Sequence, residues 1–418
     1  MRASFLSSLA VALSLTATVQ SAPGPQAGGS GYSSEEGSGS DSGSWGEWSP
    51  TTTTTAGAWV ATTSSSSAYN AYASSATTTA TTSASTSTST VACNNSPDLC
   101  SRKYSNITHM GAHDAAFLRN AETSNSVAGN QYYNATKALN AGIRLLSAQV
   151  HNLNGTLELC HTTCSLLDAG SLESWLGKIK YWMDKNPNEV VTLLLVNSDE
   201  EDVSTIGEAF VSSNISTYGY TPSTASASNS WPTLQSMIDA NTRLVTFVAA
   251  INASTTYPYL LNEWDYVFET AYDVKSPTAF NCTINRPVTI GDATTAISAG
   301  YLPLMNHFVY KSITSSLEVP NVAIIKNTNS ANTSITGALG QEAASCASQW
   351  GQAPVFAMVD FFDQGPAITT ADNLNGITAV GRSDSNVATV TTSAAGHSVV
   401  MGKTGALVAF LAAAVLFY

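Results

Sequence analysis

Apolar runs typical of buried strands alternate with helix-patterned segments through the middle of the chain. Residues 189–197 form a nearly continuous apolar run rich in β-branched side chains, as expected for a strand covered on both faces of a parallel sheet. Ahead of it, apolar residues recur at helical spacing across 172–183, after Ser171 as a predicted N-cap and before the Asn186-Pro187 pair that ends the helix. The pattern predicts one helix followed by one buried strand.

The same alternation extends over residues 93–368 and predicts a fold class. The sequence predicts a first strand that runs into a turn at 106–115, further strands at 143–151, 156–160, 243–249, 266–269, 302–308 and 355–361, and a helical segment that starts at 234–238. Alternating strands and helices predict a parallel sheet. The length favours a single-domain, closed TIM-type (β/α) barrel over an open sheet.

Both ends of the chain are biased in composition and are expected to lie outside this domain. Residues 1–21 have the layout of a secretory signal peptide. Residues 22–92 are expected to form a disordered, O-glycosylated Ser/Thr-rich stalk, and residues 369–395 a Ser/Thr-rich linker. Residues 396–418 resemble a glycosylphosphatidylinositol (GPI) attachment signal, with a tail-anchored span as the alternative. We therefore expect a secreted protein held by a lipid anchor at the extracellular face of the plasma membrane, or placed in the cell wall.

The charge balance bears on the class of partner. The 418 residues hold 16 Lys+Arg against 29 Asp+Glu, a formal net charge of −13. Because no basic surplus exists to neutralise a phosphate backbone, a nucleic-acid partner is not expected. The negative overall charge does not exclude a local basic pocket for a single phosphate group.

Cysteines and glycosylation sequons agree with passage through an oxidising secretory route. Proximity suggests the disulfides Cys93–Cys100 and Cys160–Cys164, which would leave Cys282 with Cys346, although six cysteines allow other pairings. A zinc site at 160–164 is an alternative that lacks a second ligand pair at finger spacing. The predicted N-glycosylation sites are Asn94, Asn106, Asn134, Asn154, Asn214, Asn252, Asn281 and Asn332.

Histidines near predicted strand ends are the main candidates for chemistry. His113 and Asp114 follow the first strand, His161 follows the strand at 156–160, and His151 shares one face of the second strand with Gln149. Imidazole titrates near neutral pH, so two such groups on one phosphodiester could act as base and acid. A single histidine is better explained as a hydrogen-bonded rim residue, but the pair weakens that explanation.

Several strings around these histidines resemble one known family. They are 109–115, 131–149 with Gly142-Ile143-Arg144, 157–161, 186–191, 306–308 and 359–365. In this order they are similar to the X domain of the phosphatidylinositol-specific phospholipase C superfamily, and most similar to the secreted fungal branch of PLC-like phosphodiesterases. The resemblance covers roughly residues 93–368.

The resemblance implies a TIM-type barrel that cleaves a phosphodiester by intramolecular attack. By motif match, His113 would be the base that activates an inositol hydroxyl, His161 the acid that protonates the leaving oxygen, and Asp360 the carboxylate that orients the base. No cofactor and no metal are expected. The expected partners are a phosphodiester or phosphoinositide-like ligand and the outer membrane leaflet.

The chain also departs from that family. Active relatives carry an acidic residue and then an arginine on the second strand, where this chain has Ser147 and Gln149. His151 could supply a compensating positive charge in an acidic medium. A catalytically inactive barrel that acts as a surface or wall glycoprotein or binding module is therefore a second hypothesis, and a metal-dependent glycerophosphodiesterase a more distant third. The further predicted substrate-binding residues are Asp114, Gln149, His151, Glu269 and His307.

Overall fold

The computed structural model describes residues 91–314 and 317–383, which form a barrel of eight parallel strands. Around the barrel the strand order is β7-β6-β5-β2-β1-β12-β9-β8, and every neighbouring pair is parallel. The strands are β1 (His109–Ala112), β2 (Leu145–Leu153), β5 (Val191–Asn197), β6 (Leu244–Ala249), β7 (Leu260–Asn262), β8 (Val267–Glu269), β9 (Leu302–Asn306) and β12 (Phe356–Val359). The predicted TIM-type fold is confirmed.

The ring of backbone hydrogen bonds is open at one seam. β7 and β8 are three residues each, and within the described residues no ladder joins them. The short 3-10 helix Glu263–Asp265 connects the two strands, and the Glu263 side chain is buried there. Full closure by strand pairing was therefore a wrong expectation, because a turn of helix takes the place of the last ladder.

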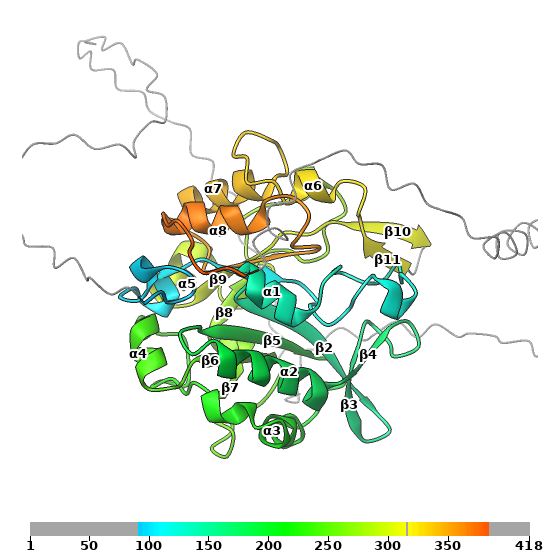
Figure 1. Cartoon of the computed structure of the whole chain (residues 1–418). Coiled ribbons are helices and arrows are strands. Elements are labelled where there is room, and N and C mark those ends of the chain that lie inside the picture. The colour runs from blue at the N-terminus through cyan, green and yellow to red at the C-terminus, as the bar shows by residue number, and fades with distance from the viewer. Residues whose placement is uncertain (1–90, 315–316, 384–418) are drawn as a thin grey trace, which may run out of the picture. The chain divides into compact units, whose positions relative to one another are not determined.

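Two hairpins extend beyond the barrel. β3 (Thr156–Cys160) pairs antiparallel with β2 and with β4 (Asp168–Ser171). The predicted strand at 156–160 is thus present, but it folds back on β2 and is not one of the barrel strands. The second hairpin joins β10 (Tyr310–Thr314) to β11 (Leu317–Pro320). Figure 1 shows both hairpins projecting on the same side of the barrel.

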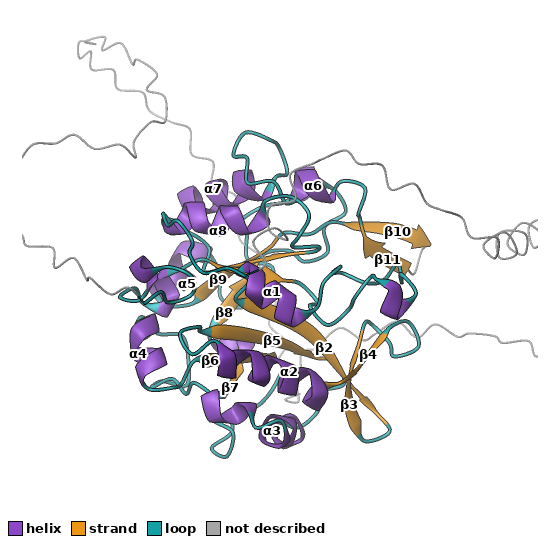
Figure 2. Ribbon diagram, viewed as in Figure 1, coloured by secondary structure: helices purple, strands orange, loops and turns teal. Residues whose placement is uncertain are grey.

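Helices cover the outside of the barrel, as Figure 2 shows in purple around the orange strands. They are α1 (Ala135–Ala141), α2 (Leu172–Lys185), α3 (Val203–Ser212), α4 (Leu234–Asp239), α5 (Ala293–Ser298), α6 (Ile325–Thr328), α7 (Leu339–Trp350) and α8 (Ala367–Asn375). The helix predicted at 172–183 is α2, and Ser171 caps it by accepting a hydrogen bond from the N–H of Ser174 at 3.3 Å. Helices and capping therefore follow the sequence pattern closely.

Alternating side chains divide the core between the inside of the barrel and the layer under the helices. On β5, Leu194 belongs to one apolar cluster, while Leu193 and Leu195 belong to the other. Space inside the barrel is tight next to the first strand: a Cβ added to Gly111 would lie 2.8 Å from Cγ of Met358 and 2.9 Å from Cδ2 of Leu145. Only glycine fits at this position on β1.

The C-terminal boundary predicted for the domain is wrong. Helix α8 begins at Ala367, so residues 369–375 of the predicted linker are helical. Asn375 exchanges hydrogen bonds with the backbone of Thr108, at 2.8 Å to its N–H and 2.9 Å to its carbonyl. Further on, the N–H of Val380 donates to the carbonyl of Asn95. Asn375 and the backbone of Val380 hold this segment in place, although its composition is similar to that of a linker.

The predictions of disulfides and of glycosylation sites have different outcomes. All three predicted disulfides are present: Cys93–Cys100, Cys160–Cys164 and Cys282–Cys346. Seven of the predicted glycosylation sites are exposed: Asn106, Asn134, Asn154, Asn214, Asn252, Asn281 and Asn332. Asn94 is only 5% exposed and its Oδ1 accepts a hydrogen bond from Val190, so the folded chain has no room for a glycan there.

The predicted signal peptide, stalk and lipid-attachment segment lie outside the described residues, as does the linker beyond residue 383. Among the helices of residues 91–314 and 317–383, none has the length and apolar character needed to span a bilayer.

Candidate active site

Strands β1 and β12 bring His113 and Asp360 together. β1 and β12 are paired in register, and both residues follow directly after their strands. Nδ1 of His113 lies 2.9 Å from Oδ1 of Asp360, and the Asp360 side chain is almost fully buried. A carboxylate on Nδ1 fixes the imidazole tautomer and leaves Nε2 to exchange protons. The predicted contact between His113 and Asp360 is present.

His161 reaches the same place from the β3–β4 hairpin. Nε2 of His113 lies 3.6 Å from Oδ2 of Asp114, and Nε2 of His161 lies 3.8 Å from the same oxygen. Asp114 is 1% exposed and has a positive φ of 48°, a conformation that Asp tolerates. Its N–H donates to Oγ of Ser147 at 2.8 Å, which holds this conformation. The two imidazoles therefore converge on one carboxylate oxygen.

Gln149 and Asp114 are bound within the protein and are not free for a ligand, unlike our expectation. Nε2 of Gln149 donates to Oδ2 of Asp114 at 2.7 Å, and its Oε1 accepts from the N–H of Thr162 at 2.9 Å. Gln149 thus connects the end of β1 to the turn that carries His161. Its position on β2 is as predicted, but its contacts are those of a positioning residue.

Sequence reasoning missed two residues beside the base. Asn130 is fully buried, and its Nδ2 donates to Oδ1 of Asp360 at 3.0 Å and lies 3.4 Å from Nδ1 of His113. Gln131 donates from Nε2 to the carbonyl of His113 at 2.7 Å. Both belong to the loop before α1, and their polar pair in an otherwise ordinary loop was the only signal in the sequence.

An aromatic ring completes the surroundings of the base. Phe308, two residues after β9, stacks on the imidazole of His113 with centroids 3.8 Å apart and planes inclined by 7°. Phe117 meets the His161 ring edge-on, with centroids 5.2 Å apart and planes at 77°. Each histidine therefore has one apolar neighbour and at least one carboxylate in its surroundings.

Burial and charge act in opposite directions on the two histidines. Burial alone would lower the pKa of His113, but the carboxylates of Asp114, Asp360 and Glu269 outweigh it and raise that pKa. At His161 burial dominates and lowers the pKa, with Asp114 offsetting part of the effect and His113 adding to it. The two pKa values are therefore shifted in opposite directions, upward at His113 and downward at His161.

A cavity of about 600 Å³ opens at His161. Its walls come from the β3–β4 turn, from Gln149, from the residues after β8 and from the β10–β11 hairpin, including Tyr272, Tyr310 and Glu318. These are the two hairpins that lie on one side of the barrel in Figure 1. A cavity of this size has room for a small ligand, and its placement beyond the carboxyl ends of the strands is typical of TIM-type barrels.

The family follows from comparison with known proteins. The family model described as PI-PLC X 1 matches residues 99–375. The chain belongs to the PI-PLC X domain family. A PI-PLC X domain-containing protein 1 of Arthroderma benhamiae is 33% identical over 287 residues, covering 68% of this chain and 90% of that protein. An uncharacterized secreted protein of the same organism is 34% identical over 303 residues, covering 70% of this chain and 66% of the relative, just under two thirds of its length.

Solved structures give a more distant likeness. The phosphatidylinositol-specific phospholipase C of Listeria monocytogenes has a TM-score of 0.44 at 16% identity, covering 67% of this chain and 96% of that one. A Staphylococcus aureus phosphatidylinositol-specific phospholipase C has a TM-score of 0.42 at 13% identity, with coverage of 66% and 94%.

Three other predicted site residues of the X domain bind to partners other than His113 and His161. His151 binds Asp199 through Nδ1 at 3.1 Å. Glu269 lies at the end of β8, where it forms an ion pair with Arg286, and its charge still reaches His113. His307 is fully buried: its Nδ1 contacts Glu342 and its Nε2 lies 2.8 Å from the carbonyl of Thr328. His307 is a structural residue, and its prediction as a substrate ligand was wrong.

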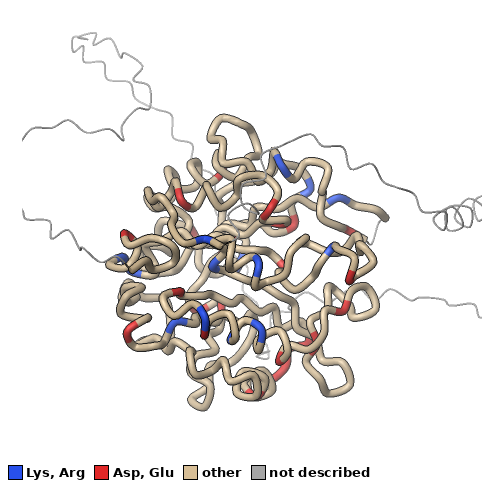
Figure 3. The backbone as a smooth tube through the Cα atoms, in the orientation of Figure 1, with Lys and Arg blue, Asp and Glu red and all other residues tan. Residues whose placement is uncertain are grey.

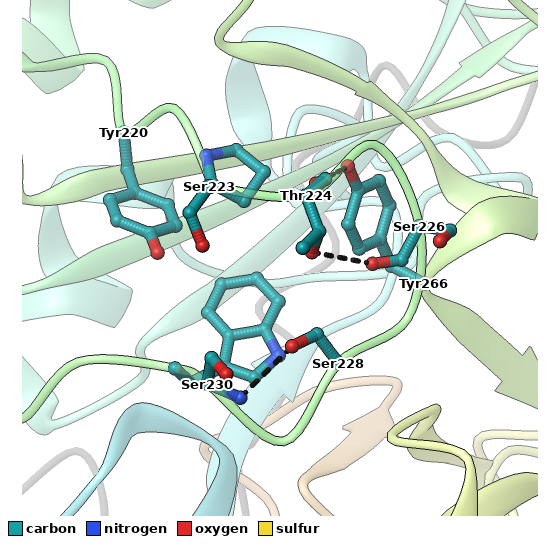
Figure 4. Close-up of a pocket in the computed structure, with 9 residues that line it drawn as sticks. Tyr220, Ser223, Thr224, Ser226, Ser228, Ser230 and Tyr266 are labelled. Carbon is teal, nitrogen blue, oxygen red and sulfur yellow. Dashed lines mark hydrogen bonds between the residues drawn. The ribbon is translucent and has the colours of Figure 1, made fainter.

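A second pocket of the X domain does not offer a comparable site. Figure 4 shows tyrosine rings and serine hydroxyls around it, with Thr224 and Ser228 engaged in local hydrogen bonds. Its volume is about 10 Å³, which is no more than the space of one water molecule. No group of three or more His, Cys, Asp or Glu side chains arranged to hold a metal occurs in the described part of the chain.

Proposed function

We propose that the X domain is a phosphoric diester hydrolase that cleaves an inositol-type phosphodiester without a metal. His113 takes the proton of the attacking hydroxyl, that oxygen bonds to phosphorus, and His161 gives its proton to the leaving oxygen, so that a cyclic phosphate forms. The observation that carries this proposal is the convergence of both Nε2 atoms on one oxygen, at 3.6 and 3.8 Å. A phosphate bound beside this carboxylate would lie near both imidazoles, one of which could act as base and the other as acid.

Asp360 would orient the base and stabilise its charged form. The carboxylate contacts Nδ1 of His113, and Asn130 donates to the same oxygen of Asp360. A fixed carboxylate prevents the imidazole from turning and stabilises the imidazolium that forms when His113 takes a proton. Asn329 adds support by donating to the carbonyl of Asp360 at 2.8 Å.

The electrostatics of the pair predict slow turnover. The proposed reaction needs a neutral His113 and a protonated His161, whereas the opposite shifts in their pKa values favour protonation of His113 over His161. Only the minor protonation form would then start the reaction. Gln149 also favours a weak catalyst, because a neutral amide that already bonds to Asp114 and Thr162 supplies no positive charge to the phosphate.

The place of action would be the outer membrane leaflet or the cell wall. One relative is a secreted protein by name, and the three disulfides of this chain suit an oxidising compartment. The predicted lipid anchor would bring the cavity to a membrane that carries the substrate. Figure 3 shows Lys and Arg interspersed with Asp and Glu along the described chain in this view, in keeping with a single small ligand rather than a nucleic acid.

A non-catalytic binding barrel is the second candidate. It is favoured by one observation: both Nε2 atoms face the carboxylate of Asp114, whose Oδ2 also accepts a hydrogen bond from Gln149. A barrel used only for binding would keep this closed network and would show no turnover. Any affinity for a phosphodiester would then survive removal of the histidines.

The experiment that separates the two candidates is an assay of the purified protein on phosphatidylinositol and its glycosylated derivatives with a chelator present. We expect slow release of a cyclic phosphate that is abolished in His113→Ala and His161→Ala. His151→Ala is the matched control, because His151 binds Asp199 outside the pair. Equal activity in all three variants would exclude the proposed mechanism, and absence of turnover in the unaltered protein would favour the binding barrel.

A further inference from the structure

The proposed reaction places negative charge on a phosphate, and two cations near the site are already paired with carboxylates in the described part of the chain. Lys275 is paired with Asp273 and Glu318, and Arg286 is paired with Glu269. Gln149 uses both ends of its amide within the protein. A phosphate bound beside His161 therefore needs another hydrogen-bond donor, and the cavity wall is where that donor has to be found.

Tyr310 has the position and the free hydroxyl that this role requires. It begins β10, four residues after the end of β9, and lines the same cavity as His161 and Gln149. Its ring packs edge-on against Phe308, with centroids 5.7 Å apart, and Phe308 in turn stacks on His113. Within residues 91–314 and 317–383, the Tyr310 hydroxyl has no hydrogen-bond partner, whereas Tyr266 donates its own to Thr224.

We propose that the hydroxyl of Tyr310 donates a hydrogen bond to a non-bridging oxygen of the phosphodiester held between His161 and His113. This inference rests on the proposed function and adds the residue that binds the phosphate. Gln149 occupies the neighbouring part of the cavity wall, but its amide nitrogen and oxygen already bond to Asp114 and Thr162.

The surroundings of Tyr310 suit a donor and not a proton acceptor. Burial and then the carboxylates of Asp360, Asp114 and Asp273 raise the pKa of its phenol, so the hydroxyl keeps its proton at neutral pH. A neutral hydroxyl surrounded by carboxylates can stabilise a phosphate group with one negative charge far better than a phosphate group with two. The structure therefore favours a phosphodiester, which carries one charge, over a phosphomonoester or a head group with additional phosphates.

The test is Tyr310→Phe, which removes the oxygen and keeps the ring against Phe308. We expect kcat to fall about a hundredfold, the usual loss for one oxyanion donor, with an unchanged melting temperature. Tyr301→Phe is the matched control, because it removes a hydroxyl from a partly buried tyrosine just before β9. Substrates with one non-bridging oxygen replaced by sulfur give a second readout: the preference for one phosphorothioate diastereomer should weaken in Tyr310→Phe and stay intact in Tyr301→Phe.

The possible outcomes separate this inference from the proposed function. If the unaltered protein turns over substrate and Tyr310→Phe matches it in kcat and in diastereomer preference, the role of Tyr310 is overturned while the enzyme remains. If the unaltered protein shows no turnover, the proposed function fails, and titration with diethyl phosphate followed by ³¹P NMR decides on Tyr310. Weaker binding by Tyr310→Phe would support the inference, and equal binding, or none by the unaltered protein, would overturn it.

Discussion

The ring of Phe308 lies flat against the imidazole of His113, with centroids 3.8 Å apart and planes only 7° from parallel. Phe308 is itself buried, and the neighbouring His307 is anchored to α7 through Glu342 and to the end of α6 through Thr328. The contacts of His307 therefore fix the position of Phe308, which is the aromatic neighbour of His113. An imidazolium on the face of a phenyl ring is stabilised by the negative charge of that face.

Phe308→Leu should lower the pKa of His113. Leucine preserves an apolar neighbour but removes the aromatic face, so the charged form of His113 loses stabilisation. A cation–π contribution of this kind corresponds to a shift of about half a pH unit. The measurement is an NMR titration of the His113 ring, which works with or without substrate turnover.

The control for this titration is Phe117→Leu. Phe117 contacts His161 edge-on, and no ring contact joins it to His113 among the described residues. We expect the pKa of His113 to stay in place in this variant. A His113 pKa that is the same in Phe308→Leu as in the unaltered protein would show that the stacking has only a packing role.

Asp360→Asn should shift the alkaline limb of the pH–rate profile to lower pH. The Asp360 carboxylate is one of the charges that raise the pKa of His113, so its removal allows the proton to leave at lower pH. The state in which His113 and His161 together hold one proton then exists over a narrower range of pH. Loss of the orienting contact should also reduce kcat by about 10²-fold or more with little change in KM. A profile whose alkaline limb does not move would assign that limb to another group.

The sequence was sufficient to predict the parts of the site that depend on strand ends. His113 and Asp360 follow β1 and β12, which are adjacent strands of one parallel sheet, so their side chains had to emerge at the same end of the barrel. The position of His161 was predicted correctly although its strand was assigned wrongly to the barrel. β3 runs back along the far end of β2, and this returns His161 to the level of Gln149, where Thr162 contacts that side chain.

The contacts of single side chains could not be predicted in this way. Asn130 lies in a loop, and nothing in its neighbourhood in the sequence indicates that its amide reaches Asp360, which is 230 positions away. Gln149 was placed on the correct face of β2, yet its binding to Asp114 depends on the positive φ of that residue. Such contacts follow from the fold as a whole, whereas strand order and capping follow from local patterns.

The Cys160–Cys164 disulfide should matter for activity, which the Cys93–Cys100 disulfide should not. It closes a turn that contains His161, where Thr162 has a positive φ of 61° and donates its N–H to Gln149. Replacing both cysteines with serine should lower kcat about tenfold, because a displacement of the acid of about 1 Å or more is costly. The free energy of unfolding should also fall, by about 2 kcal/mol, because the unfolded chain gains entropy when this short loop is opened.

The Cys93–Cys100 disulfide provides the comparison for that variant. It closes a loop at the start of the domain, where Cys93 and Cys100 belong to the apolar cluster that contains Leu194. Serine at both positions should reduce the melting temperature and leave kcat of the remaining folded protein unchanged. Equal loss of kcat in the two double variants, measured at a temperature where both are folded, would contradict a positioning role for the Cys160–Cys164 turn.

Asp363→Asn should stabilise the protein at neutral pH. Burial raises the pKa of Asp363 from 3.8 to about 6, and its Oδ1 has no hydrogen-bond partner within the described residues. The folded state thus binds this proton more tightly than the unfolded state, so the stability falls as pH rises from about 4 to about 6 and remains lower above that range. Asparagine cannot ionise, so the free energy of unfolding at pH 7 should rise by about 2 kcal/mol, with little change at pH 4. Urea unfolding at both pH values measures this difference, and an equal gain at pH 4 and pH 7 would exclude ionisation as its cause.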